Sequence, residues 1–244
     1  MIAYKFDGTF DGILCCIYKA FADKEDPYIL FSTDFQPSFD TTVKEVETSG
    51  DIAKRVSRGI VKCGSIGLLS DFSYAMRSGD GLKDTIIFKA IKKCLSAGKN
   101  VTENYADYDM LAFYDLKKRI SFETHRLKGF LRFERCAGGG LYAHLTPDND
   151  ICDLLLPHFK ARFPSEKFII HDVKRNVIAI YDGKDTAIFC GKTPLTVYID
   201  EGEPDVKSLW KTYYSAVNIK ERKNKKLQDN YLPRRYRKNM SEFL

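Results

Sequence analysis

Hydrophobic residues recur at helical spacing through the first half of the chain and at strand spacing through much of the second half. One predicted helix has its apolar stripe at Ile13, Leu14, Ile17, Tyr18 and Phe21. The same spacing predicts helices at about 52–62, from about 66, and at 105–124. A strongly periodic stretch from Leu82 to Leu95 is followed by Gly98, a residue typical of a helix C-terminus.

Short apolar runs between turn residues predict the strands. Two lie near the start, at 1–6 and 28–31. The later strands are expected at Leu127–Glu134, Leu141–Leu145, Lys167–Ile170, Val177–Tyr181 and Thr186–Cys190, with a helix that starts near Thr146. This β-β-α-β-β-β order predicts an α+β fold in which a central antiparallel sheet carries helices on one face.

The segment after residue 203 has a different pattern. Pro204 and Asp205 are typical of a helix start. Trp210, Tyr214 and Val217 share one face of this helix and are expected to anchor it on the sheet. We therefore expect an α+β body at 1–203 and a helical, basic C-terminal segment at 204–244 that packs on the body.

Positive charge is concentrated in this C-terminal segment. The whole chain has a net charge of +6, and residues 207–244 contain eleven Lys and Arg against three Asp and Glu. The cations form two clusters, Lys220, Arg222, Lys223, Lys225 and Lys226, then Arg234, Arg235, Arg237 and Lys238. Lys and Arg side chains can neutralise phosphates, and the tyrosines between them can stack on unpaired bases. A solvated helix with a loose tail is the alternative explanation of this charge run.

The cysteine and histidine patterns give no reason to expect a metal or a cofactor. The seven cysteines are odd in number and form no CxxC pair, and the four histidines show no HxH or HxxxH spacing. No GxxxxGK[ST] phosphate loop or GxSxG nucleophile motif occurs. No apolar run of eighteen residues and no secretory signal is present, so we expect a cytoplasmic protein without membrane association.

Several phrases of the sequence resemble one known family. They are the residues 6–12 (FDGTFDG), 123–133 (ETHRLKGFLRF), Pro157-His158-Phe159, Ile170-His171-Asp172, and Trp210-Lys211-Thr212-Tyr213-Tyr214. Together they resemble the "probable DNA metabolism protein" family, a domain of unknown function. The resemblance implies a DNA-repair context, with a radical SAM protein encoded nearby and fusion elsewhere to uracil-DNA-glycosylase-like domains.

Two groups of candidate functional residues follow. The expected nucleic-acid-binding residues are Arg126, Arg132, Tyr213, Arg222, Asn224, Lys225, Gln228, Arg234, Arg235 and Tyr236. His125 is expected at a helix-to-strand junction and His171 at a strand end, and either can act as a general acid or base. A structural histidine bonded to the backbone is the alternative for His125. Arg132 is expected on the polar side of the sheet.

The sequence therefore leaves three functions open. The first is a DNA-binding accessory protein of DNA repair that acts with a radical SAM partner. The second is a DNA-processing enzyme that uses His125, His171 and nearby arginines. The third is a protein scaffold for the radical SAM partner, and the sequence does not decide whether the chain is an enzyme.

Overall fold

The structure is a computed structural model that describes residues 1–32, 38–191, 196–217, 219–222 and 224–243. The chain divides into two compact units, Met1–Ser121 and Phe122–Leu244. The predicted boundary after residue 203 thus lies inside the second unit. Among the described residues, no helix has the length and apolarity needed to cross a membrane.

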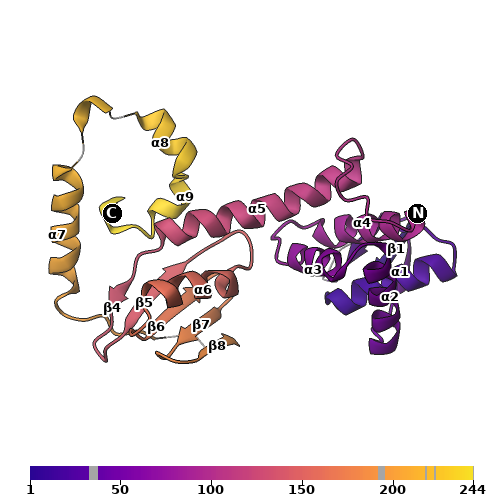
Figure 1. Ribbon diagram of the computed structural model, residues 1–244, viewed down its shortest axis with the longest axis horizontal. Coiled ribbons are helices and arrows are strands. Elements are labelled where there is room, and N and C mark those ends of the chain that lie inside the picture. The colour runs from indigo at the N-terminus through magenta and orange to yellow at the C-terminus, as the bar shows by residue number, and fades with distance from the viewer. Residues whose placement is uncertain (33–37, 192–195, 218, 223, 244) are drawn as a thin grey trace. The chain divides into compact units, whose positions relative to one another are not determined.

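The first unit combines a small parallel sheet with helices (Figure 1). Its elements are β1 (Ile2–Lys5), α1 (Phe10–Ala22), β2 (Ile29–Phe31), β3 (Thr42–Glu45), α2 (Gly50–Cys63), α3 (Ile66–Ala75), α4 (Lys83–Ala97) and the first part of α5 (Tyr108–Phe130). The strand order is β2-β1-β3, and β1 runs parallel to both neighbours. A separate sheet in the first unit was not expected from the sequence, and its strand β3 was not predicted.

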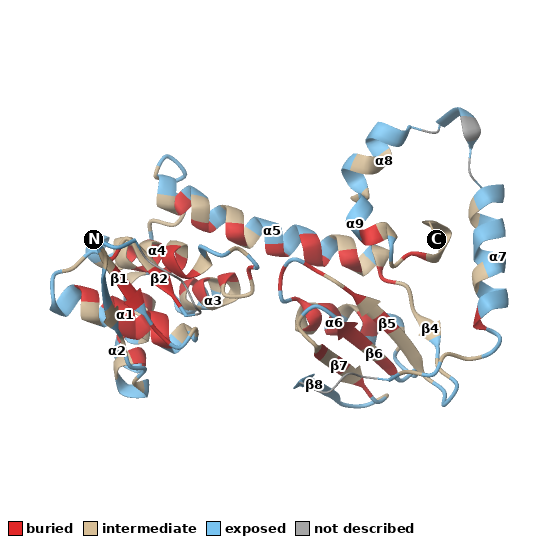
Figure 2. Cartoon of the chain, turned by 180° about the vertical axis from the view of Figure 1, so that it is seen from behind, coloured by how far each residue is buried: buried red, intermediate tan, exposed pale blue. Residues whose placement is uncertain are grey.

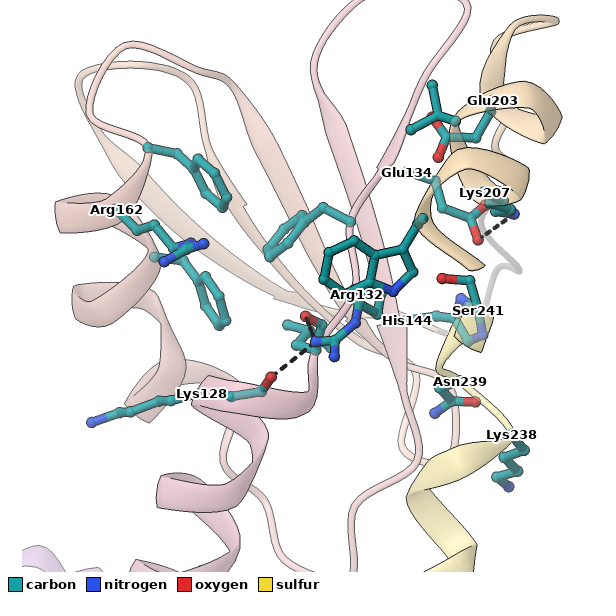
Figure 3. A pocket seen from close by; sticks show the side chains of 17 residues that line it. Lys128, Arg132, Glu134, His144, Arg162, Glu203, Lys207, Lys238, Asn239 and Ser241 are labelled. Carbon is teal, nitrogen blue, oxygen red and sulfur yellow. Dashed lines mark hydrogen bonds and ion pairs between the residues drawn. The ribbon is translucent and has the colours of Figure 1, made fainter. Parts of the chain in front are cut away.

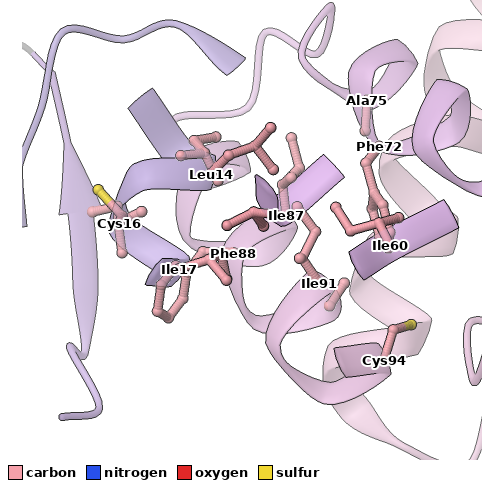
Figure 4. Packing of buried hydrophobic residues seen from close by; sticks show 14 of the residues in the cluster. Leu14, Cys16, Ile17, Ile60, Phe72, Ala75, Ile87, Phe88, Ile91 and Cys94 are labelled. Carbon is pink, nitrogen blue, oxygen red and sulfur yellow. The ribbon is translucent and has the colours of Figure 1, made fainter. Parts of the chain in front are cut away.

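The core of the first unit is made by the apolar faces of its helices and β1 (Figure 4). Leu14, Ile17, Ile87, Phe88 and Ile91 are fully buried there. Local interactions define the ends of these helices. At the start of α1, the Thr9 side chain accepts a hydrogen bond from the Gly12 amide at 2.9 Å. Gly98 ends α4 in the left-handed region at φ 63°, as its position in the sequence predicts.

The second unit contains a larger mixed sheet. Its elements are the end of α5, β4 (Glu134–Arg135), β5 (Leu141–Leu145), α6 (Cys152–Arg162), β6 (Phe168–Asp172), β7 (Val177–Tyr181), β8 (Thr186–Cys190), α7 (Glu203–Ala216), η1 (Lys220–Arg222), α8 (Lys225–Tyr231), α9 (Arg234–Arg237) and η2 (Ser241–Phe243). The five strands lie in the order β4-β5-β6-β7-β8. The protein is therefore of the α+β class.

The prediction of an antiparallel sheet is wrong. β5 and β6 run parallel, whereas the other neighbouring strands of this sheet run antiparallel. The helix α6 between β5 and β6 explains the difference, because a crossover helix returns the chain to the end of the sheet from which it left. One face of the sheet packs on α6 and buries Ala143, Phe168 and Ile170.

A second correction concerns the strand expected at Leu127–Glu134. Residues up to Phe130 belong to α5, and only Glu134–Arg135 pairs as a strand. The helix continues because Ile120, Leu127 and Leu131 extend one buried stripe at helical spacing. His125 consequently lies within a helix, and Arg132 follows the end of that helix instead of facing out from a sheet.

The C-terminal segment leaves the sheet through α7, turns through α8 and returns by α9 to the end of α5 (Figure 1). Figure 2 shows that α7 is exposed along most of its length. Trp210 does not pin α7 on the sheet as predicted: the side chain is 38% exposed and donates a hydrogen bond from Nε1 to Glu242 of η2 at 3.1 Å. Tyr214 contacts Phe243 of the same turn, with ring centroids 5.9 Å apart.

Candidate functional site

A cavity of about 530 Å³ lies within the second unit, where the end of α5, the sheet edge, α6, α7 and the C-terminal turn approach one another (Figure 3). Its charged lining comprises five cations and two carboxylates, Lys128, Arg132, Arg162, Lys207, Lys238, Glu134 and Glu203. Its aromatic lining comprises Phe133, Phe159, Phe163 and Trp210, and His144 borders it as well. The cavity thus combines positive charge with ring surfaces.

Arg132 is the residue that connects two walls of this cavity. Its Nη2 donates to Glu242 Oε1 at 2.6 Å, and its guanidinium lies over the Trp210 ring, 5.8 Å from the centroid. The Glu242 side chain is only 2% exposed. Burial alone would raise the pKa of Glu242, but the bonds from Arg132 and Trp210 outweigh burial and lower the pKa below its usual value.

Three cations around the cavity have no ion-pair partner among the described residues: Lys128, Arg162 and Lys238. Arg162 lies over the Phe163 ring, 5.6 Å from the centroid. Lys207 is neutralised by contrast, because its Nζ lies 2.8 Å from Glu134 Oε1. Figure 3 places Arg162 on the α6 side of the cavity and Lys207 and Lys238 on the opposite side. Anionic groups can therefore approach from either side.

His144 is the histidine that borders the cavity. Burial lowers the pKa of its imidazole, and the nearby charges of Lys207 and Lys238 act in the same direction, although Glu134 opposes them. His144 is paired in register with His171 of β6. Sequence reasoning missed His144, although the Tyr142–His144 alternation on a strand places both side chains on one face.

His171 is buried and bonded within the sheet. Its Nδ1 lies 3.0 Å from the Tyr142 hydroxyl, and its Nε2 lies 3.2 Å from Asn176 Oδ1. His125 is exposed on α5. No hydrogen bond or ring contact joins the two candidate catalytic histidines in the part of the chain that the structure describes. They do not form one site.

A buried carboxylate fixes the C-terminal helix α9. Glu123 of α5 accepts hydrogen bonds from the amides of Asp148 and Asn149, at 2.9 and 2.8 Å, and from the Tyr236 hydroxyl at 2.7 Å. The Arg235 guanidinium pairs with Asp148 and donates to the Tyr236 hydroxyl. Tyr236 is 3% exposed, so its ring is packed inside the protein and not offered to a base.

The remaining predicted nucleic-acid residues are spread over the C-terminal segment. Arg222, Asn224 and Gln228 line a second cavity of about 700 Å³. Asn224 also caps α8, because its side chain accepts from the Leu227 amide at 2.9 Å. Lys225 and Tyr213 are exposed and Arg126 is half-buried.

Two more basic residues of this segment serve internal contacts, and two others are not described in full. Arg234 and Arg237 both pair with Asp229, at 3.2 and 2.6 Å. Lys223 lies outside the described residues, and the side chain of Lys220 is not described. Sequence charge alone therefore overstates the number of cations that are available to a ligand.

Of the predicted site residues, only Arg132 lines the cavity of about 530 Å³. Sequence reasoning missed Glu203 because an acid at the first turn of a predicted helix is ordinary. Glu203 is 7% exposed, and its Oε2 accepts from the Arg135 amide at 2.9 Å. In the described part of the chain, no group of three or more His, Cys, Asp or Glu side chains is placed to hold a metal ion.

Comparison with known proteins gives a family but no activity. No curated protein and no solved structure matches the chain. A family model described as a domain of unknown function, DUF4130, matches residues 82–242. This match covers most of the chain, including the whole of the cavity lining, and the chain therefore belongs to the DUF4130 family.

Proposed function

We propose that the chain is a DNA-binding accessory protein of DNA repair that acts with a radical SAM partner and holds DNA on its second unit. The observation that carries the proposal is the cavity with aromatic walls and three cations that have no ion-pair partner in the described part of the chain. The resemblance to DNA metabolism proteins supports DNA as the anion and a radical SAM protein as the partner.

The distribution of charge supports an anionic ligand on this unit. Residues 122–244 contain 22 Lys and Arg against 16 Asp and Glu, whereas residues 1–121 contain 17 of each. The whole net charge of +6 therefore resides in the second unit. A local excess of cations attracts a polyanion and releases its counterions, and this supplies most of the sequence-independent affinity for nucleic acid.

Fluorescence anisotropy of a labelled single-stranded oligonucleotide at increasing salt tests the proposal. With four to six phosphate contacts, affinity is expected to fall about 10²–10³-fold between roughly 50 and 200 mM salt. The triple variant Lys128→Ala, Arg162→Ala, Lys238→Ala should bind more weakly and lower the slope of log affinity against log salt by about 2.

A matched triple variant in the first unit provides the control. Lys54, Arg58 and Lys62 are exposed cations of α2. Their replacement by alanine removes the same total charge and should leave both affinity and salt slope nearly unchanged. A salt-independent affinity, or equal losses in the two triple variants, would contradict the proposal.

The exposed apolar residues of α7 favour protein docking as a second role. Val206, Leu209 and Tyr213 are 57%, 71% and 58% exposed. Exposed apolar groups at this density are typical of protein interaction surfaces. Co-purification with the implied radical SAM protein should be lost in Leu209→Ser, while DNA affinity is retained; retained co-purification would argue against α7 as the docking surface.

No observation favours the alternative of an enzyme built on His125 and His171. One is exposed on a helix, and the other is bonded on both ring nitrogens to Tyr142 and Asn176. A general base must lie within hydrogen-bond reach of the proton that it removes. The accessory role is therefore the function that the geometry supports best.

A further inference from the structure

The cavity that Arg132 and Trp210 line has the dimensions and walls of a site for a small planar ligand. Its volume of about 530 Å³ lies within the range of roughly 300–1,000 Å³ that is typical of small-molecule sites. Phe133, Phe159 and Phe163 form one aromatic wall, and Trp210 of α7 contributes to the lining as well. A nucleobase with its sugar and phosphate is a ligand of this size and shape.

The indole of Trp210 is held in place before any ligand binds. Arg132 lies over the ring at 5.8 Å, and Nε1 donates to Glu242 at 3.1 Å. The side chain nevertheless remains 38% exposed. A ring that is already fixed loses little conformational entropy when a base stacks on it, and this favours binding.

Glu203 provides the cavity with a hydrogen-bond acceptor, the carboxylate oxygen Oε1. The residue is 7% exposed, and Oε2 is used by the Arg135 amide. Among the described residues, Oε1 receives no hydrogen bond. An ionised carboxylate only accepts hydrogen bonds, so Oε1 on the cavity wall can accept from an N–H donor of a ligand.

This acceptor favours bases that present an amino group. Cytosine and adenine carry exocyclic N–H₂ donors at positions where thymine shows a carbonyl oxygen. A thymine carbonyl would face the Glu203 carboxylate with like partial charge. Lys128, Arg162 and Lys238 around the cavity can meanwhile hold the flanking phosphates.

We infer that this cavity receives one unpaired nucleobase that carries an exocyclic amino group, with Glu203 accepting from that amino group. A base inside a duplex cannot enter a cavity, so the ligand is single-stranded or the nucleotide is turned out of the helix. The inference rests on the proposed DNA-binding function and specifies which part of the DNA this site holds.

The single tryptophan of the chain makes the inference measurable. Trp210 is the only Trp in the sequence, so intrinsic tryptophan fluorescence reports on this cavity alone. The full chain is titrated with oligo(dC), oligo(dT) and an abasic strand of equal length, while anisotropy of a strand label measures binding separately. Oligo(dC) should quench Trp210, the abasic strand should not, and oligo(dC) should bind about 10-fold more tightly than oligo(dT).

Glu203→Gln tests the role of the carboxylate. Its side-chain oxygen can still accept from the Arg135 amide, and its N–H₂ group can meet a thymine carbonyl, so the preference for oligo(dC) over oligo(dT) should fall to about 1. Glu201→Gln is the matched control, since Glu201 is exposed just before the same helix. This variant should keep the preference of the unmodified chain.

The outcomes separate the inference from the proposed function. Salt-sensitive binding of every strand without base preference, or with equal quenching by the abasic strand, would overturn the base site and leave the DNA-binding function standing. Absence of binding to any strand would overturn the proposed function. A titration with dCMP would then test the base site alone: quenching of Trp210 by dCMP would support the site, and no quenching would overturn it.

Discussion

Tyr236 and Glu123 are 113 positions apart in the sequence and are joined by a hydrogen bond of 2.7 Å between the phenol hydroxyl and the buried carboxylate. Burial and the neighbouring carboxylate raise the pKa of Tyr236, so the phenol remains protonated and able to donate. Through this bond α9 is held against α5. The basic C-terminal segment is thereby attached to the sheet unit near its end as well as at its start.

Tyr236→Phe should weaken this attachment. The change removes one hydrogen bond to a charged acceptor, and we expect the free energy of unfolding to fall by about 1.5–3 kcal/mol. Urea denaturation measures the loss, and hydrogen exchange of the α9 amides shows where it occurs. Tyr231→Phe is the control, because Tyr231 is 72% exposed. Equal effects of the two variants would contradict a special role for the Tyr236 bond.

Acid should release η2 from α7. The folded pKa of Glu242 is depressed, so its stabilising contribution is present above the ordinary glutamate pKa of about 4.3 and is lost as the pH falls through the lower, folded pKa. Because Trp210 donates to Glu242, its emission should change over this acid range. Glu242→Gln should remove the transition, whereas Glu221→Gln, at an exposed position, should keep it.

Asp84 should destabilise the first unit at neutral pH. The residue is 8% exposed, and its Oδ1 has no hydrogen-bond partner among the described residues. Burial raises the pKa of Asp84, although Lys83 opposes the shift. With a raised folded pKa, the stabilising contribution is full below the ordinary pKa of about 3.9 and is lost as the pH rises through the folded pKa.

Asp84→Asn should therefore raise the free energy of unfolding at pH 7 by about 1 kcal/mol, since the charge no longer has to be buried. It should also flatten the dependence of stability on pH just above the ordinary aspartate range. Asp51→Asn, at an exposed acid in the first turn of α2, provides the comparison. A loss of stability in Asp84→Asn would show that the carboxylate is needed as a charge.

Gly12 should tolerate no side chain. A Cβ built on Gly12 would lie 2.3 Å from Asp7 Oδ1 and 2.7 Å from a ring carbon of Phe6. Gly12→Ala is expected to lower the free energy of unfolding by about 1–3 kcal/mol, as overpacked sites do. Gly50 also lies in a helix but has nothing within 4 Å of such a Cβ. Gly50→Ala should be neutral or stabilising in the same thermal or urea assay.

The elements that sequence predicted well are those with a strong local pattern. β7 and β8 have the predicted bounds, Val177–Tyr181 and Thr186–Cys190. The end of α4 follows directly from the left-handed preference of Gly98. In these segments the residues themselves decide the conformation, and distant contacts do not override them.

The elements that sequence predicted poorly depend on contacts between distant residues. Leu127 and Leu131 fit both an alternating strand and a helical stripe, and packing decides for the helix. β3 has no apolar alternation, because Val43 is its one apolar residue, and three of its four residues are exposed in the structure. The cavity was beyond prediction for the same reason: Lys128, Arg162 and Lys238 come to line one cavity only after the chain has folded.

The α4 helix has a practical consequence for work on this family. The matched segment begins at residue 82, one residue before α4, yet the apolar face of α4 is buried in a core that also contains Tyr4, Leu14 and Ile60. A fragment cut at the family boundary would leave Ile87, Phe88 and Ile91 without this cover. Such a fragment should aggregate during expression, so a workable truncation has to keep the first 81 residues or omit the entire first unit.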